Sequence, residues 1–506
     1  MTHIHSFEKR LLLTGILLGL AVRLWIAWQP ANELSWRATA DDAYYYFKLA
    51  QHLGAGAGAT FDGVNPTNGF HPLYALLLVP IFQYVGNHIE LGVNLALTLV
   101  ALAGVATAWP IYLIGKYVHS PRAGVIGALV HLLNPWVVVL TMTGVESAVY
   151  VCCFAWTVMA YMRWRLQDRS LCGVALVGLL AGLTVMARSE GGLLLAGIIL
   201  DLLILHQRAP KRAIACAALC GLSASVVCLP WAFWSISRFG TPFQISASAI
   251  MVHNYADIPS NTVAALEWYI GRVFWFIPRY AYKIVLFNLP TVLILGLLLV
   301  RALFTGQLPL KIAWPSISQL SFLILPFVFT SAYYNLILLH QQHWYFNTLV
   351  LIVTLTGAPI IAEEVARLKG LSSYQKYQKV AVAAMCCVFV VIVAVVWQRG
   401  LYPGQADAYI LGRHIASSAL RYDRIGATDS GIAGFFCRCT MVNLDGVMNN
   451  AAVVYYRAHG YDQKTIFDFA RAQRVAYVWS SAPSPADEVR IVRRIRFAAG
   501  VLYQIR

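Results

Sequence analysis

Residues 11–52 read LLLTGILLGLAVRLWIAWQPANELSWRATADDAYYYFKLAQH, an apolar segment followed by two adjacent carboxylates. The segment from Leu11 to Trp28 has the length that an α-helix needs to cross the hydrocarbon core of a bilayer. A Lys-Arg pair precedes it, so the positive-inside rule predicts a cytoplasmic N-terminus and places Asp41 and Asp42 on the outer face. Acidic side chains at a membrane boundary are costly to hold and usually carry function, which makes this pair a candidate site.

The composition is that of a polytopic membrane protein. Of the 506 residues, 59% are hydrophobic and 12% are charged, and the mean hydropathy is +0.64. At about 20 apolar residues per span, the sequence predicts about eleven transmembrane helices. The first of them is expected to stay uncleaved, because the opening lacks a small-residue cleavage site. The predicted spans are residues 11–29, 92–115, 123–140, 147–162, 171–187, 191–205, 213–234, 284–302, 317–339, 347–362 and 380–397.

Every loop that this predicted topology assigns to the cytoplasm is basic, as the positive-inside rule requires. The basic residues of these loops are Lys116 and Arg122; Arg163, Arg165 and Arg169; Arg208, Lys211 and Arg212; Arg301 and Lys311; and Arg367, Lys369, Lys376 and Lys379. The net charge of +16 is therefore mostly a matter of topology. We expect membrane lipid, and no nucleic acid, as a partner of this chain.

The chain divides into a transmembrane domain, residues 1–398, and a smaller domain, residues 399–506. Two long outer loops, residues 30–91 and 235–283, belong to the first domain. The second domain alternates helix-like stretches (ADAYILGRHIASSAL, TIFDFARAQ, PADEVRIVRRI) with β-type runs (RIGAT, MVNLD, VAYVWSS, VLYQI). This alternation predicts a small extracytoplasmic α/β domain. The apolar run LYALLLVPIF in the first loop is short for a span and predicts a helix in the interface or packed on the bundle.

Cysteine usage agrees with a membrane protein. Eight of the ten cysteines lie in predicted spans, where we interpret them as small apolar residues. Cys437 and Cys439 face the outside, and this C-x-C pair can form a bridge, hold a metal weakly or do neither. We favour a structural role, because neither a CxxC motif nor a His-rich partner supports a metal site.

Four motifs resemble those of integral-membrane glycosyltransferases of the GT-C superfamily. They are DDAYYYFKLAQHL at 41–53, GFHPLYALL at 69–77, TGVESAVY at 143–150 and ARSEGG at 187–192. In this order the motifs are similar to those of aminoarabinose transferases, protein O-mannosyltransferases and bacterial arabinofuranosyltransferase-like proteins. The resemblance covers about the first 240 residues. Each motif alone is weak, but four in sequence order at one membrane face are fairly specific.

The resemblance implies transfer of a sugar, a hexose or a pentose, from a polyprenyl phosphate to an acceptor hydroxyl or amine, usually with inversion. It further implies a reaction at the outer face of the cytoplasmic membrane, with an envelope glycan, lipid or protein as the acceptor. The first acid of the family's acidic pair is its proposed catalytic base, and Asp41 holds that position here. A carboxylate that takes the acceptor proton provides general-base assistance of about 10²- to 10⁴-fold. Phosphate leaves readily, so one base is enough.

Structural roles compete with this assignment for the acidic residues. Asp41 or Asp42 can instead be the N-cap of the helix that follows them. Glu146 is expected at the outer end of its helix, where it can bind the acceptor, orient Asp41 or cap the helix. Arg188 and Glu190 flank an outer turn, and a buried ion pair between them is as plausible as a binding site.

The leaving phosphate needs cationic or hydrogen-bonding groups. Better-known relatives have a lysine before proline where this chain has His71, and another lysine near the position of Arg188. Guanidinium suits phosphate well, whereas a near-neutral histidine offers one donor rather than a permanent charge. We also expect His343 and Tyr345 of HQQHWYF to contact substrate, although aromatic belts and interface histidines are common in membrane proteins.

Three further expectations concern cofactors, rival functions and the small domain. We predict no cofactor and no metal, and leave a divalent cation open. A polyprenyl-linked glycan carrier is a rival function, but a transporter would place ionisable residues near the midplane rather than at one face. A non-catalytic envelope assembly protein is the other rival. We expect residues 399–506 to govern acceptor choice rather than chemistry.

Overall fold

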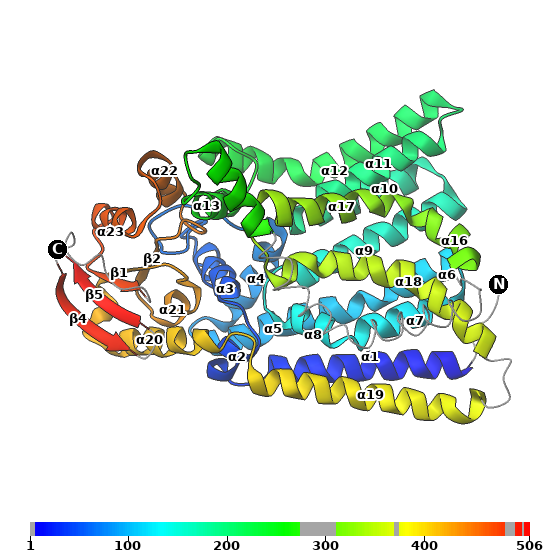
Figure 1. The fold of residues 1–506 in the computed structure, drawn as a ribbon, viewed down its shortest axis with the longest axis horizontal. Coiled ribbons are helices and arrows are strands. Elements are labelled where there is room, and N and C mark those ends of the chain that lie inside the picture. The colour runs from blue at the N-terminus through cyan, green and yellow to red at the C-terminus, as the bar shows by residue number, and fades with distance from the viewer. Residues whose placement is uncertain (1–5, 274–309, 369–373, 481–490, 498–499, 506) are drawn as a thin grey trace.

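The computed structural model describes residues 6–273, 310–368, 374–480, 491–497 and 500–505. Long helices lie side by side in a bundle, and a unit of sheet and short helices covers one end of it (Figure 1). The N-terminal end of α1 lies at the opposite end of the bundle.

The bundle is built from thirteen helices of the described residues. They are α1 (Ser6–Ala27), α5 (Ile89–Ala106), α6 (Ala108–Val118), α7 (Pro121–Leu132), α8 (Pro135–Met142), α9 (Ser147–Arg163), α10 (Leu171–Ala187), α11 (Gly191–Leu205), α12 (Pro210–Phe239), α16 (Leu310–Ile317), α17 (Ile324–Ala332), α18 (Asn347–Leu368) and α19 (Tyr374–Arg399). Short 3-10 or π turns extend several of them: η1 (Trp164–Asp168), η2 (Ser318–Leu323), η3 (Tyr333–Ile337) and η4 (His343–Phe346).

Ten of the eleven predicted spans coincide with these helices, and the span predicted at 284–302 lies outside the described residues. By length and composition, five helices in the described part of the chain can cross a membrane, or up to seven if each of two bent helix pairs is one span. Helices α10 and α11 are apolar but shorter. The chain is thus a multi-pass helical membrane protein, and the predicted number of about eleven spans stays a prediction.

The span predicted at 123–140 is broken into α7 and α8, which meet at 56°. The break lies at Asn134, whose side chain accepts a hydrogen bond from the amide of Trp136 and so starts a new helix with Pro135 at its first position. The guanidinium of Arg23 donates to the carbonyl oxygen of Leu132 at 3.2 Å, at the C-terminal end of α7. A buried cation therefore satisfies a carbonyl that the break would otherwise leave exposed to an apolar interior.

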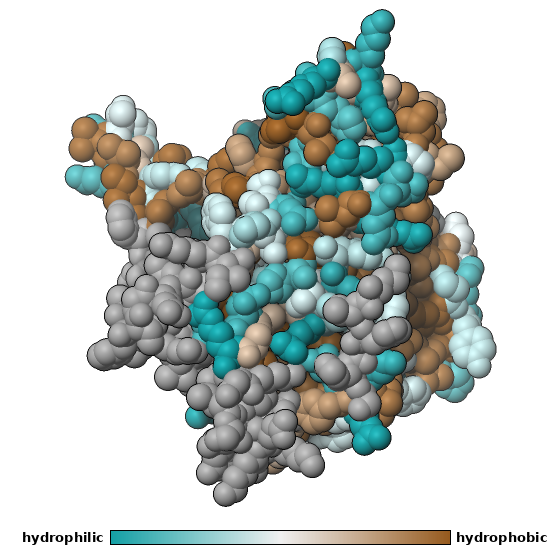
Figure 2. All heavy atoms as spheres, turned by 90° about the vertical axis from the view of Figure 1, so that its right-hand side faces the viewer, coloured by the Kyte–Doolittle hydropathy of each residue, from teal (hydrophilic) through white to brown (hydrophobic). Residues whose placement is uncertain are grey.

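The bundle end remote from the sheet carries the described parts of the loops that were predicted to be cytoplasmic. Figure 2 shows this face, on which polar side chains gather between apolar ones. Several basic side chains here make ion pairs or hydrogen bonds: Arg122 with Glu8, Arg165 with Asp201, and Arg212 with the carbonyl oxygen of Arg169. The opposite end of the bundle holds the first outer loop and the sheet (Figure 1).

The first outer loop forms three helices, α2 (Ala31–Arg37), α3 (Asp41–Gly54) and α4 (Pro72–Val85). The short apolar run predicted to be an interfacial or packed helix is α4, and it packs against α3, α5 and α10. Buried aromatic side chains of α3 lie in one hydrophobic core with residues of the C-terminal unit such as Phe435 and Phe436. The loop and the C-terminal unit therefore share a single core.

Residues 400–506 contain a five-stranded sheet with the order β2-β1-β3-β5-β4. Strands β1 (Arg424–Ala427), β2 (Thr440–Asn443) and β3 (Tyr477–Ser480) are parallel, while β5 (Gly500–Ile505) runs antiparallel to β3 and to β4 (Ile491–Phe497). The helices of the unit are α20 (Ala406–Ser417), α21 (Gly431–Phe436), α22 (Asn450–His459) and α23 (Gln463–Ala472), with the 3-10 turns η5 (Pro403–Gln405) and η6 (Ala419–Tyr422).

One local prediction in this unit was wrong. PADEVRIVRRI was expected to be helical, but its second half begins strand β4. The run from Ile491 to Phe497 pairs along its length with β5, and this pairing outweighs the local helical pattern. The other predicted elements of this region are present as α20, α23, β1, β2, β3 and β5.

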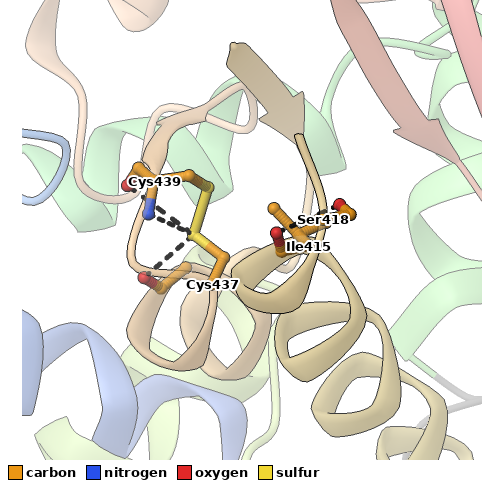
Figure 3. Close-up of a disulfide and its surroundings, with 5 residues drawn as sticks. Ile415, Ser418, Cys437 and Cys439 are labelled. Atoms are coloured by element: carbon orange, nitrogen blue, oxygen red, sulfur yellow. Dashed lines mark hydrogen bonds between the residues drawn. A yellow bond between two sulfur atoms is a disulfide. The ribbon is translucent and has the colours of Figure 1, made fainter. Parts of the chain in front are cut away.

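Cys437 and Cys439 form a disulfide next to α20 (Figure 3). The bridge follows α21 directly, and the backbone amide of Cys439 contacts the sulfur of Cys437 at 3.1 Å. Of the alternatives left open by the sequence, the structure therefore has the bridge. The remaining eight cysteines are free, and all of them lie in bundle helices.

Candidate active site

A cavity of about 430 Å³ lies between the bundle and the C-terminal unit. Its lining combines a cluster of charged and aromatic side chains with an apolar wall. Six predicted site residues line it: Asp42, His71, Glu146, Arg188, Glu190 and Tyr345. Asp41 and His343 do not. The four motifs that lie far apart in the sequence are thus brought together at one end of the bundle.

Arg188 is the centre of the polar cluster. It is the C-cap residue of α10, where extended backbone turns its side chain toward α9 and η3. Its Nη1 donates to Glu146, and its Nη2 donates to Glu190 at 2.8 Å and to the hydroxyl of Tyr334 at 2.7 Å. Only 4% of Arg188 is exposed. The predicted pair with Glu190 is present, but it belongs to a larger network on the cavity wall.

The imidazole of His71 stands beside this network. His71 precedes Pro72, the first residue of α4, and its Nε2 lies 3.9 Å from a carboxylate oxygen of Glu146. Burial lowers the pKa of His71, so the ring is neutral at neutral pH. Its Nδ1 is buried and has no hydrogen-bond partner in the described part of the chain. A neutral imidazole with an unused ring nitrogen can bind a polar ligand group.

Asp42 presents a carboxylate to the cavity. No hydrogen bond or ion pair holds this side chain within the described residues. Burial raises the pKa of Asp42 well above its usual range, and nearby carboxylates, first Asp41 and then Asp429, raise it further. A carboxylate whose pKa is raised is a stronger base than an ordinary aspartate once it has lost its proton.

Asp41 points to the C-terminal unit instead. Its two carboxylate oxygens accept hydrogen bonds from the backbone amides of Gly431 at 2.9 Å and Ile432 at 2.7 Å. Burial and the charge of Asp429 raise the pKa of Asp41 to about 7, against the lowering effect of the two amides. The prediction that Asp41 or Asp42 is the N-cap of α3 was wrong, because Ala40 is the N-cap residue of that helix. The side chain of Asp41 instead accepts hydrogen bonds from the first turn of α21.

Aromatic rings cover the polar cluster on the side of α18. Tyr345 stacks on Tyr334 with ring centroids 4.2 Å apart, and the guanidinium of Arg188 lies 5.1 Å from the centre of the Tyr345 ring. Tyr345 therefore lines the cavity next to Arg188, and its contact with substrate stays a prediction. His343 lies instead against Trp136, with ring centroids 5.5 Å apart.

Several cavity residues escaped the sequence analysis. Tyr334 anchors Arg188, and helix α13 (Ile245–Asn254) lines the cavity with Ser246, Ala247 and Ile250. Nothing in their local sequence distinguishes these residues from ordinary loop or helix residues. The C-terminal unit contributes Val447 and Met448, which follow the segment NLDG at 443–446.

Comparisons with known proteins agree with this fold. A family model described as dolichyl-phosphate-mannose-protein mannosyltransferase matches residues 70–234, which hold two of the four motifs and all but the first residue of a third. The crystal structure of ArnT from Cupriavidus metallidurans bound to undecaprenyl phosphate superposes with a TM-score of 0.58 at 13% identity, covering 96% of this chain and 97% of that one. No curated protein matches the sequence.

A second similar structure is the apo form of the oligosaccharyltransferase from Archaeoglobus fulgidus, with a TM-score of 0.53 and 15% identity over 94% of this chain and 69% of that one. At such identities the similarity establishes the fold. The matched family segment and these structures agree with the resemblance of the four motifs to GT-C glycosyltransferases.

Proposed function

We propose that the protein is a glycosyltransferase that moves a sugar from a polyprenyl-phosphate donor to a hydroxyl or amine of an envelope glycan, lipid or protein. The observation that carries this proposal is the cavity at one end of the membrane bundle, where an arginine and an apolar wall meet a carboxylate that has no partner in the described part of the chain. This combination suits a substrate with a sugar, a phosphate and an isoprenoid chain. The rival functions, carrier and assembly protein, need no such carboxylate.

The apolar wall offers a place for the isoprenoid. Phe243, Phe329 and Ile337 line the cavity, and 68%, 57% and 49% of them are exposed, respectively. Helix α17 and the segment before α13 therefore continue the wall out to the molecular surface. An apolar path from a polar cavity to the lipid-facing surface fits a ligand whose tail stays in the bilayer.

The phosphate fits between Arg188 and His71. Glu146, Glu190 and Tyr334 fix the plane of the guanidinium, and one hydrogen of Nη1 keeps no partner in the described part of the chain. Cationic and hydrogen-bonding groups held in place before the reaction stabilise the charge that builds on a departing phosphate. The unused Nδ1 of His71 adds a possible hydrogen bond from the other side.

We assign the base to Asp42 rather than to Asp41. Asp42 lines the cavity and has no hydrogen-bond or ion-pair partner among the described residues, whereas both oxygens of Asp41 accept hydrogen bonds from the α21 amides. In the proposed reaction the acceptor oxygen or nitrogen forms a bond to the anomeric carbon. At the same time its proton passes to Asp42 and the bond to the phosphate oxygen breaks. A single displacement of this kind inverts the anomeric configuration.

A transfer assay tests the function. Purified protein in lipid nanodiscs is incubated with radiolabelled undecaprenyl-phosphate hexose, pentose or amino sugar and with envelope extract. The proposal predicts that label leaves the lipid donor and appears in an acceptor. A carrier would move the donor across sealed vesicles without cleaving it. If none of the donors is cleaved and none binds, the protein is not a polyprenyl-phosphate transferase of these sugars.

The rate should depend on pH in a way that reports the state of Asp42. Because the folded environment raises the pKa of this carboxyl, the base is lost at a pH well above that of an ordinary aspartate, about 3.9. We expect kcat/KM to rise with increasing pH through an acid limb that lies clearly above this value. An acid limb at the ordinary pKa, or its persistence in Asp42→Asn, would remove Asp42 from the role of base.

The site should face the extracytoplasmic side. The Cys437–Cys439 disulfide belongs to the C-terminal unit, and disulfides persist in oxidising compartments. We expect Tyr422→Cys, at an exposed position of this unit, to react with a membrane-impermeant thiol reagent in intact cells. Gln207→Cys, exposed at the other end of the bundle, should react only after the membrane is opened. The reverse labelling pattern would invert the topology.

A further inference from the structure

We propose that Asp41 is a positioning residue that docks the C-terminal α/β unit onto helix α3 and thereby aims Asp42 into the cavity. This inference rests on the proposed function. It gives the two adjacent aspartates different roles, and it makes the C-terminal unit a part of the active site rather than a separate acceptor domain.

The docking contact is formed by the carboxylate of Asp41 and the first turn of α21. Each oxygen of Asp41 accepts one backbone N–H bond, from Gly431 and from Ile432. The first amides of a helix have no partner within the helix, so a buried carboxylate satisfies them and complements the helix dipole. The contact is strongest when the Asp41 carboxyl is ionised, because hydrogen bonds to an ionised acceptor are roughly twice as strong as neutral ones. Only 8% of Asp41 is exposed, so water competes little for these bonds.

Close backbone contact adds to the hydrogen bonds. A Cβ at Gly431 would clash with the backbone carbonyl oxygen of Asp41, and a Cβ at Gly69 would clash with the carbonyl oxygen of Val447. Glycine is therefore required at both places for the C-terminal unit to approach the first outer loop. Asn68 and Asn450 join the same two segments by a hydrogen bond of 2.9 Å.

A second contact lies one helical turn further along α3. The hydroxyl of Tyr45 accepts hydrogen bonds from the amide of Ser430 at 2.9 Å and from the side chain of Asn443 at 3.2 Å. Ser430 is the N-cap residue of α21, and Asn443 ends strand β2. Asp41 and Tyr45 thus both bind the N-terminal end of α21. These two contacts fix the rotation of α3 about its own axis.

The position of the Asp42 side chain depends on these contacts between α3 and α21. Its carboxylate has no hydrogen-bond partner among the described residues, so its direction follows from the placement of the α3 backbone. Val447 and Met448 of the C-terminal unit line the same cavity. A shift of α3 or of the unit would therefore move the base and the cavity wall together. Misplacement by about 1 Å can cost about 10²-fold in rate.

The test compares three variants of the full chain in lipid nanodiscs. Asp41→Asn removes one acceptor and places an amide donor against a backbone N–H. Gly431→Ala leaves both aspartates intact but forces α21 away from Asp41. Gly404→Ala, in the same unit with open space around the position, is the matched control. Each variant is measured for amide hydrogen exchange in residues 431–436 and for kcat and KM with the undecaprenyl-phosphate sugar that the wild type transfers.

We expect faster exchange in residues 431–436 for Asp41→Asn and Gly431→Ala, with kcat lower by about 10²-fold and KM for the donor within about threefold of wild type. Gly404→Ala should match the wild type in both measurements. A lower kcat with a nearly unchanged KM indicates that the base is misplaced in a folded protein that still binds donor. A protein that has lost its fold would lose donor binding as well.

Two results would overturn the proposal. The first is a large loss of kcat in Asp41→Asn with unchanged exchange and a fully active Gly431→Ala, which would make Asp41 the base. The second is normal turnover in both variants. If the wild type transfers none of the donor sugars, the proposed function has failed, and the exchange measurement alone then decides the docking role: unchanged exchange in Asp41→Asn and Gly431→Ala refutes it.

Discussion

Asp42→Asn should lower kcat by about 10²- to 10⁴-fold while the affinity for the lipid donor stays nearly unchanged. The substitution keeps the shape of the side chain but removes its ability to take a proton. The carboxylate has no structural partner in the described part of the chain, so folding should be little affected. Turnover and donor binding, measured with the same nanodisc preparation, separate the two effects.

The control for this prediction is Asp257→Asn, which removes an exposed aspartate of the second outer loop. It should behave as the wild type does. If Asp42→Asn turns over at a normal rate, another group must take the acceptor proton, and Asp41 and Glu146 become the candidates. A complete loss of donor binding would instead make Asp42 a binding residue.

Arg188→Ala should have the second large effect, on both stability and activity. The guanidinium pairs with Glu146 and Glu190, and all three side chains are largely buried. Removal of one partner leaves uncompensated buried charge, which costs about 3–5 kcal/mol. We expect a clearly lower melting temperature, a higher KM for the donor and a lower kcat, because the phosphate loses its cation both before and during bond cleavage.

Two further variants make this result interpretable. Arg188→Lys keeps the charge but not the planar fork, so it should recover part of the stability and part of the activity. Arg413→Ala removes an arginine that is half exposed and pairs with Glu90 at 3.4 Å, and it should change little. If Arg188→Ala binds and turns over donor normally, Arg188 is a structural ion-pair partner of Glu190 and does not bind the phosphate.

Much of the bundle follows from hydropathy alone, because a helix buried in lipid must be apolar over its length. The positions that were harder to predict are those where backbone detail decides. The bend at Asn134 depends on a local cap that hydropathy does not register. Strand β4 was mistaken for a helix because its pairing with β5 is not visible in its own residues.

The candidate site, like the bundle, could be predicted in part from the sequence. His71, Glu146, Arg188 and Glu190 could be predicted as neighbours, because their motifs all fall at the outer ends of predicted helices. Which aspartate faces the cavity could not be predicted, because adjacent helical residues point about 100° apart. The rotation of α3 is set by contacts with α21, which lies some 390 residues further along the chain.

A structure of the Asp42→Asn variant with an intact undecaprenyl-phosphate sugar would show which side chains hold the donor. We expect the phosphate between Arg188 and His71, the isoprenoid along the apolar wall toward α17, and the anomeric carbon facing the carboxamide at position 42. Asp41 should keep its two bonds to the amides of α21. A donor bound outside this cavity, or a sugar placed against Asp41 with α21 displaced, would contradict the assignment of Asp42 as the base.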